Sequence, residues 1–107
     1  MGKEEQQALS CQKTDHVFSI FDKKWMGLIV DVLLEGPLRY KDIAVKIPSI
    51  SDRVLVLRLK ELMENGIVER VVYPETPVRV VDHLTEKVES LKEVLAQVHK
   101  WAEKWVE

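Results

Sequence analysis

The chain has 107 residues, of which 46% are hydrophobic and 32% are charged, and its formal net charge is −2. These values are typical of one globular domain and exclude a disordered chain. No apolar run approaches the roughly 18 to 20 residues that span a bilayer. The polar start MGKEEQQALS lacks the apolar segment of a signal peptide, so we expect a cytoplasmic protein that makes no membrane contact.

Two helices are predicted ahead of the first proline. The first covers about residues 11–21 and the second about residues 24–34. Gly36-Pro37 ends the second helix, because glycine suits the position after a helix and proline cannot continue one. Val17, Phe18 and Phe21 lie on one face of the first helix, and the second helix is expected to bury Trp25, Leu28, Ile29, Val32 and Leu33.

Two further helices are predicted close together. Leu38-Arg39 forms a very short extended stretch before a third helix over about residues 40–47, which Pro48 ends. The fourth helix covers about residues 52–64 and can be capped by Ser49 or Ser51. Asn65-Gly66 closes this helix. Its apolar side recurs at helical spacing through Leu55, Leu59 and Leu62.

Runs of β-branched residues then replace the helical period. The runs over residues 67–73 and 78–81 flank Pro74-Glu75-Thr76-Pro77, which predicts a β-hairpin with a proline-bounded tip. Thr85 then caps a long last helix that reaches about residue 105. The apolar residues of this helix form an unbroken heptad seam: Leu84, Val88, Leu91, Leu95, Val98, Ala102 and Trp105.

This order of elements is that of a winged helix-turn-helix, a mainly α fold with one small hairpin, in a single domain over residues 1–107. The helix-turn-helix occupies about residues 40–65 and the wing about residues 67–84. Between Gly36 and Leu62 the sequence has six Lys or Arg residues against three Asp or Glu residues. Attraction of phosphate depends on local charge rather than on total charge. A chance excess of positive charge on a solvated surface explains these numbers equally well.

Several motifs resemble the HxlR-type winged-helix regulators, over about residues 11–105. The combination of the Lys-Trp pair, the Gly-Pro-Leu-Arg block and the Tyr-Pro-Glu-x-Pro wing makes the resemblance specific. The matching segments are Lys24-Trp25, residues 36–43, Ile50-Ser51, Leu55, Leu59, Glu61-Leu62, residues 66–68, residues 70–80 and residues 84–86. Gln12, Asp82 and Val88 depart from the family's usual proline, aromatic and glycine. The resemblance implies a regulator of transcription that is most similar to members sensing quinones and other electrophiles.

In this architecture the fourth helix enters the major groove of operator DNA, with its N-terminal residues nearest the base edges. Arg53 is the best candidate for a bidentate guanine contact, and Ser51 with the neighbouring backbone N–H groups suits a phosphate. Val56 could contact thymine methyl groups, whereas Leu57 is expected in the core. Arg58 either reaches a phosphate or pairs with an acidic residue, Glu61 or Glu64.

The remaining candidates for contact with DNA lie around this helix. Arg39 and Lys41 flank the start of the third helix, which crosses the DNA backbone in such folds. Arg79 on the wing could reach the minor groove. The other candidates in the reading unit are Ser49, Asp52 and Lys60.

Apolar surface left over on the first and last helices, at about residues 11–21 and 85–105, predicts a two-fold homodimer. A dimer presents two reading helices to half-sites one DNA turn apart. Alternatively, the first helix of the same subunit covers part of the seam. The predicted interface residues are Phe18, Leu91, Leu95, Val98, Trp101 and Trp105.

The single cysteine, Cys11, cannot form an internal disulfide. If Ser10 caps the first helix, Cys11 lies in its opening turn, where unpaired backbone N–H groups and the neighbouring Lys13 favour the reactive thiolate. A buried and inert cysteine is the alternative. The family resemblance favours a repressor that leaves its operator when Cys11 is modified by quinones, other electrophiles or oxidants. The modification could be alkylation, a mixed disulfide with a small thiol, or pairing of Cys11 with its equivalent in a second copy.

Two other functions stay open at this point. One is a repressor controlled by a non-covalent ligand near the dimer helices, with Cys11 incidental, and the other is a winged helix used only for protein–protein contact. An enzyme is not indicated, because no paired carboxylates, phosphate-binding glycine loop or Cys–His pair at a useful spacing is found. His16, His83 and His99 are scattered, so no metal and no other cofactor is expected.

Overall fold

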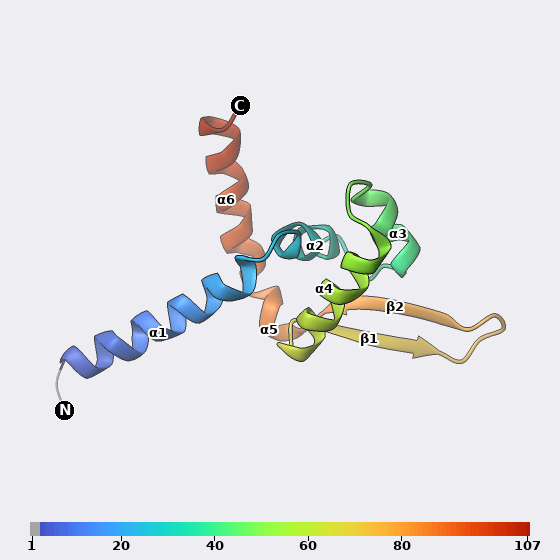
Figure 1. Cartoon of the computed structure of the whole chain (residues 1–107), viewed down its shortest axis with the longest axis horizontal. Coiled ribbons are helices and arrows are strands. Elements are labelled where there is room, and N and C mark those ends of the chain that lie inside the picture. Colours follow the sequence, from blue (N-terminus) through green and yellow to red (C-terminus); the bar gives the residue numbers. More distant parts are fainter. Residues whose placement is uncertain (1–2) are drawn as a thin grey trace.

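The structure, a computed structural model, describes the backbone of residues 3–107 and the side chains of residues 11–107. Figure 1 shows a central group of short helices, a long hairpin and two helices that project outward. The elements are α1 (Lys3–Phe21), α2 (Met26–Leu33), α3 (Tyr40–Lys46), α4 (Asp52–Glu64), β1 (Val68–Tyr73), β2 (Arg79–Leu84), α5 (Glu86–Glu89) and α6 (Leu91–Trp105). This is the predicted mainly α winged helix-turn-helix.

The core lies between α2, α3, α4 and the base of the hairpin. The predicted inward residues of α4 are confirmed: Leu55, Leu59 and Leu62 are fully buried. Helix α2 buries the face formed by Met26, Ile29, Val30 and Leu33. Leu28, which was expected in the core, is exposed, because it lies outside this i, i+3, i+4, i+7 stripe.

Local hydrogen bonds explain both ends of α4. The Ser51 hydroxyl oxygen accepts from the backbone N–H of Val54 at 3.2 Å, so Ser51 and not Ser49 caps the helix. At the other end, Gly66 donates to the carbonyl of Met63 and Ile67 donates to that of Leu62. With Gly66 at a φ of 71°, this is a Schellman motif. The predicted bounds of this helix are therefore confirmed.

The wing is an antiparallel hairpin whose second strand lies in the middle. Strand β2 pairs with β1 on one side and with Leu38 on the other, through two backbone hydrogen bonds between Leu38 and Asp82. The predicted short extended stretch at Leu38 is thus part of the wing. The strand over residues 78–81 was predicted too short, since β2 continues to Leu84. Asp82 accordingly belongs to the wing and not to the start of the last helix.

The last helix is broken, contrary to the prediction of one helix over residues 85–105. The Ser90 hydroxyl donates to the carbonyl of Lys87 at 3.2 Å at the junction of α5 and α6. A serine that bonds backbone in this way competes with regular helix formation. The predicted heptad seam is therefore interrupted, with Leu84 in β2 and Val88 in α5, both buried in the domain's own core.

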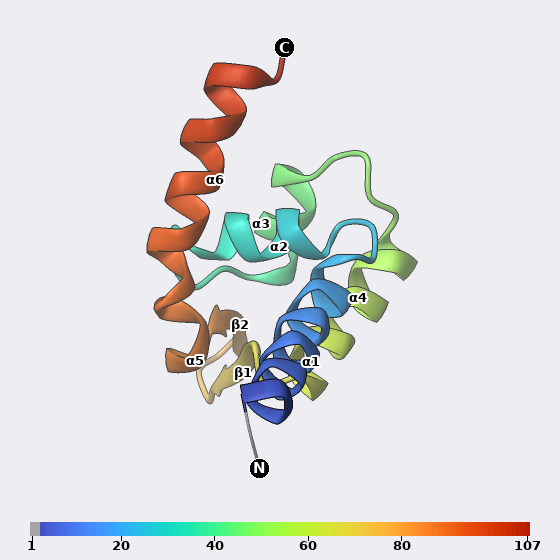
Figure 2. The same ribbon diagram turned by 90° about the vertical axis from the view of Figure 1, so that its left-hand side faces the viewer.

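Helices α1 and α6 project from the domain in different directions (Figures 1 and 2). The radius of gyration is 16.3 Å, whereas a compact chain of this length has about 13 Å. Helix α1 begins at Lys3 rather than near Cys11, and among its described side chains only Ile20 and Phe21 pack against the core. No helix in the described part of the chain combines the length and apolar character needed to cross a bilayer.

Candidate nucleic-acid interface

One face of α4 is turned to solvent, opposite the buried leucines. Arg53, Val56, Leu57 and Lys60 occupy positions i, i+3, i+4 and i+7, so they form a continuous stripe. Val56 is 57% exposed and Leu57 is 49% exposed. The expectation that Leu57 is in the core is therefore wrong. Residue 57 lies about 200° around the helix axis from Leu55, because each residue turns the helix by about 100°.

A side-chain clamp holds the start of α4 against α3. The hydroxyl of Tyr40, at the start of α3, lies 3.0 Å from the backbone carbonyl of Asp52 and 3.2 Å from its carboxylate. Burial and the charge of Asp52 raise the pKa of Tyr40. Asp52 thus has a structural role at the helix N-terminus, where a carboxylate is favourable. Ser49 lies in the connector and is exposed.

Four cations around this face have no ion pair with any described side chain. They are Arg39, Lys41, Arg53 and Lys60, and all are exposed. Lys46 at the end of α3 is instead paired with Glu35 at 3.0 Å. Unpaired cations keep their full charge for a ligand, so this group is the part of the surface best suited to attract phosphate.

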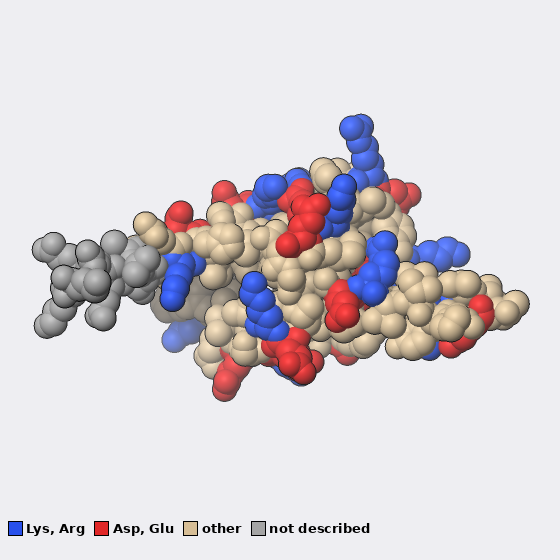
Figure 3. Space-filling view, turned by 90° about the horizontal axis from the view of Figure 1, so that it is seen from below, with Lys and Arg blue, Asp and Glu red and all other residues tan. Residues whose placement is uncertain are grey.

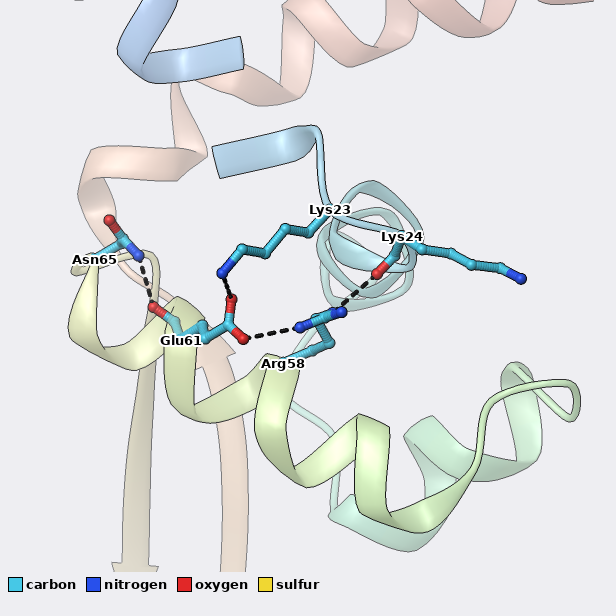
Figure 4. Close-up of polar contacts among 5 residues, drawn as sticks. All are labelled: Lys23, Lys24, Arg58, Glu61 and Asn65. Carbon is cyan, nitrogen blue, oxygen red and sulfur yellow. Dashed lines mark hydrogen bonds and ion pairs between the residues drawn. The ribbon is translucent and has the colours of Figure 1, made fainter. Parts of the chain in front are cut away.

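Arg58 points away from this stripe into contacts within the protein (Figure 4). Its Nη1 lies 2.8 Å from Oε1 of Glu61, and its Nε donates to the carbonyl of Lys24 at 3.0 Å. The second of the two expectations for Arg58, pairing with an acidic residue, is therefore the one that the structure shows. The Arg58 side chain is only 19% exposed, so it supports α4 from the side of the helix that faces the rest of the protein.

The wing holds its arginine in place. The guanidinium of Arg79 lies over the ring of Tyr73 at 4.1 Å and pairs with Glu75 at 3.2 Å. On the side shown in Figure 3, the projecting hairpin carries mostly uncharged side chains, whereas basic and acidic residues are mixed over the domain. Arg79 is therefore available to DNA only together with, or after release from, Glu75.

Cys11 is exposed in the subunit, so it is not buried as the alternative interpretation expected. The residue lies well inside α1, which begins at Lys3, and not in an opening turn. The expected effect of unpaired backbone N–H groups on its thiol therefore does not apply. The Ser10 side chain lies outside the described residues. Cys11 lines a shallow hollow of about 300 Å³ together with Thr14, Asp15 and Phe18.

Helix α6 keeps an apolar face without cover. Val94, Val98, Trp101 and Trp105 are exposed, and the two tryptophans remain 62% and 64% accessible. Leu91 and Leu95, also predicted to lie in a dimer interface, pack partly against the domain's own core. Helix α1 points away from α6 in both views, so it does not cover this face (Figures 1 and 2). Phe18 on α1 is likewise exposed.

Two contacts at the site were not predicted from the sequence. The sequence assigns no role to Tyr40, whose hydroxyl joins the start of α3 to Asp52 at the start of α4. Lys23 pairs with Glu61 at 2.8 Å across 38 positions of sequence, and no local pattern indicates such a pair. Within the described residues, no group of His, Cys, Asp and Glu side chains is arranged to hold a metal ion.

A helix-turn-helix with a solvent-facing second helix, unpaired cations beside it and a hairpin after it defines a winged helix-turn-helix regulator of transcription. Residues 20–107 match the HxlR-like helix-turn-helix family, and the chain belongs to that family.

Among its relatives, the HTH-type transcriptional regulator YodB of Bacillus subtilis is 48% identical over 97 residues, covering 91% of this chain and 87% of YodB. The reduced form of YodB superposes with a TM-score of 0.80 over 89% of this chain and 93% of the YodB chain. Quinone-bound YodB, at 42% identity, gives a TM-score of 0.77 over 89% of this chain and all of the other. The protein is thus a DNA-binding regulator and not an enzyme.

Proposed function

We propose that the protein is a dimeric repressor that binds operator DNA through α4 and leaves it when Cys11 is modified by an electrophile or oxidant. The observation that carries DNA binding is the solvent-facing stripe of α4. It combines two apolar side chains, Val56 and Leu57, with two unpaired cations, Arg53 and Lys60. An exposed apolar pair on a helix is costly without a partner, and thymine methyl groups in a major groove supply one.

Each part of the site has a distinct task on the duplex. Arg53, in the first turn of α4, makes the bidentate guanine contact, and Lys60 lies near the backbone of the same groove. The Ser51 hydroxyl and the N–H groups at the helix start face a phosphate. Arg39 and Lys41 contact the DNA backbone from the start of α3. Arg79 on the wing contacts DNA either together with Glu75 or after its pair with Glu75 opens.

Two copies associate through α1 and α6. The argument rests on apolar surface that the subunit itself leaves open, namely Phe18 on α1 and the face of Val94, Val98, Trp101 and Trp105 on α6. Exposed tryptophans are among the residues most enriched at the centres of protein interfaces. Two-fold pairing would place the two α4 helices about 34 Å apart, one turn of DNA.

DNA binding is tested with a labelled duplex from the region upstream of the protein's own gene. We expect Arg53→Ala to weaken binding by about 10- to 100-fold. The matched control is Lys92→Ala, because Lys92 lies on α6 away from α4 and is also exposed. Sedimentation of the free protein supplies the oligomeric state. A monomer that ignores every duplex at low salt would overturn the proposal.

Regulation through Cys11 is supported by the exposure of the thiol, which lines a hollow of the surface that a small electrophile can enter. The thiolate then adds to the conjugated C=C bond of a quinone, a C–S bond forms, and proton uptake gives a hydroquinone thioether. The relative YodB has been crystallised with quinone bound.

The thiol is tested by measuring operator affinity before and after treatment with 1,4-benzoquinone or diamide, in the wild type and in Cys11→Ser. We expect the wild type to lose affinity and the variant to keep it, with the mass of each protein reporting the modification. An equal loss in both proteins would show that Cys11 is not the sensor.

A further inference from the structure

The orientation of α1 is set where the helix ends. Of its described side chains only Ile20 and Phe21 pack against the core. Residues 22–25 then form a joint, defined here as the segment between α1 and α2, in which Trp25 adopts a φ of 81°. Because the rest of α1 projects into solvent, whatever holds this joint also fixes the direction of the helix that carries Cys11 (Figure 1).

Two neighbouring side chains of α4, Glu61 and Arg58, hold the joint. Nζ of Lys23 lies 2.8 Å from Oε2 of Glu61, and Nη1 of Arg58 lies 2.8 Å from Oε1 of the same group. Nε of Arg58 also donates to the carbonyl of Lys24 at 3.0 Å. Figure 4 shows these contacts as one continuous chain, with the Lys24 side chain directed away from it.

Glu61 is the less exposed end of the ion pair that connects the joint to α4. Its side chain is 18% exposed, whereas that of Lys23 is 56% exposed, and Arg58 beside it on α4 is 19% exposed. The hydrogen bond from Lys23 is the main cause of a lowered pKa of Glu61, against the opposing effect of burial. Partly buried pairs with additional hydrogen bonds are costly to break on one side, since the remaining charge is left without a partner.

The C-terminal end of α4 is also hydrogen-bonded to the segment that leads to α6. Asn65 donates from Nδ2 to the backbone carbonyl of Glu61 at 2.8 Å, and Lys87 of α5 donates to the carbonyl of Asn65 at 3.3 Å. The joint that follows α1 and the helix α5 that precedes α6 are therefore both held by contacts near Glu61. Arg53 and Lys60, on the DNA-facing stripe, belong to the same rigid helix.

We propose that Glu61 is a positioning residue that passes the disposition of α1 to the reading helix α4, so that a change at Cys11 alters DNA binding through the Lys23–Glu61–Arg58 contacts. This inference rests on the proposed function of α4 and Cys11. A tilt of α1 moves Lys23 and the carbonyl of Lys24, and α4 follows because its residues Glu61 and Arg58 hold these two groups.

The test compares two variants that break the Lys23–Glu61 contact with two control variants that leave this contact intact. Lys23→Gln and Glu61→Gln remove one end each of the ion pair. Lys24→Gln and Glu64→Gln are the controls, since the Lys24 side chain is directed away from the connection in Figure 4, and Glu64 is exposed and forms no ion pair with a described residue. For each protein, operator affinity is measured before and after 1,4-benzoquinone treatment, and the ratio of the two affinities is the readout.

We expect the controls to match the wild-type ratio and the two variants that break the contact to show a ratio smaller by about fivefold or more. A merely structural role would lower the free energy of unfolding, measured in urea, without changing this ratio. Equal ratios in all variants would overturn the role of Glu61 while leaving DNA binding and Cys11 sensing intact. A wild type that keeps its affinity after quinone treatment would instead overturn the role of Cys11 and, with it, this inference.

Discussion

The guanidinium of Arg70 lies directly across the wing from the carboxylate of Asp82, with its Nε 2.9 Å from Oδ1. Asp82 is 1% exposed and also exchanges two backbone hydrogen bonds with Leu38. This pair therefore joins β1, β2 and the extended stretch before α3 at one point. The pKa of Arg70 is raised, chiefly by its hydrogen bond to Asp82.

The two partners of this pair differ in burial, which predicts unequal effects of mutation. Arg70→Met leaves a buried carboxylate without its cation and should lower the free energy of unfolding by about 3 kcal/mol. Asp82→Asn keeps a hydrogen-bonding group of the same shape, leaves the cation of Arg70 in contact with water, and should cost about 1 kcal/mol. Urea unfolding measures both. An Asp82→Asn cost equal to that of Arg70→Met would contradict this reasoning.

Gly66 should tolerate asparagine better than alanine. Its φ of 71° lies in the left-handed region, and a Cβ there would meet no atom within 4 Å, so only the backbone conformation opposes a side chain. We expect Gly66→Ala to cost about 1 kcal/mol and Gly66→Asn less, because asparagine enters this region more readily. Thermal unfolding measures the stability of both variants. Equal losses of stability would show that the positive φ of residue 66 does not determine the cost of a side chain there.

The Tyr40 hydroxyl should contribute to stability until high pH. Its pKa is raised above 10.0, so the folded protein keeps the phenol proton longer than the unfolded chain. The stability from its bond to Asp52 is thus present below about pH 10 and is lost as the pH rises through the raised pKa. At neutral pH we expect Tyr40→Phe to cost about 1 kcal/mol. Tyr73→Phe is the control, and an equal cost there would remove the argument for the clamp.

The stability that Glu61 contributes should be lost at low pH, whereas that of Tyr40 is lost at high pH. Its pKa is lowered from 4.5, so the unfolded chain binds the proton first as the pH falls. The stability that the ionised carboxylate contributes is present above the unfolded value and is lost as the pH falls through the lowered one. The difference in unfolding free energy between wild type and Glu61→Gln should therefore shrink as the pH falls below about 4.5. A difference that stays constant over this range would contradict the ion pair.

Substitutions of Lys60 and Arg58 should have different effects, the first on DNA affinity and the second on the stability of the fold. Lys60→Ala removes one exposed cation and should reduce the slope of log affinity against log salt by about 0.9, with stability unchanged. Arg58→Ala removes the contacts to Glu61 and Lys24 and should lower the free energy of unfolding first. Titrations at several salt concentrations, together with urea unfolding, check both. An unchanged slope for Lys60→Ala would place this residue away from the phosphates.

Local signals explain which parts of the fold could be predicted. Helix α4 was predicted with its observed bounds, because a capping serine, three leucines at helical spacing and Asn-Gly all lie within the segment itself. The start of α1 was missed, since residues before Cys11 offer no apolar period. The break between α5 and α6 falls at Ser90, whose hydroxyl donates to the carbonyl of Lys87, and the heptad pattern does not reveal it.

The candidate site divides in the same way. The outward position of Arg53 and Lys60 follows from the spacing of the leucines, and Leu57 could have been placed by the same helical geometry. The connection of Lys23 to Glu61 joins residues 38 positions apart. Such a contact is decided by how the joint and α2 pack against α4, and packing between distant elements leaves no periodic trace in the sequence.

The left-handed backbone of Trp25 has a consequence for the shape of the whole molecule. A residue other than glycine in this conformation costs about 1 kcal/mol or more, here offset by the partial burial of the indole against the core. Residues 22–25 continue neither helix, so α1 and α2 meet at an angle at this joint (Figure 1). The indole of Trp25 thus helps to hold the direction of α1, and replacing it would loosen the base of the helix that carries the thiol.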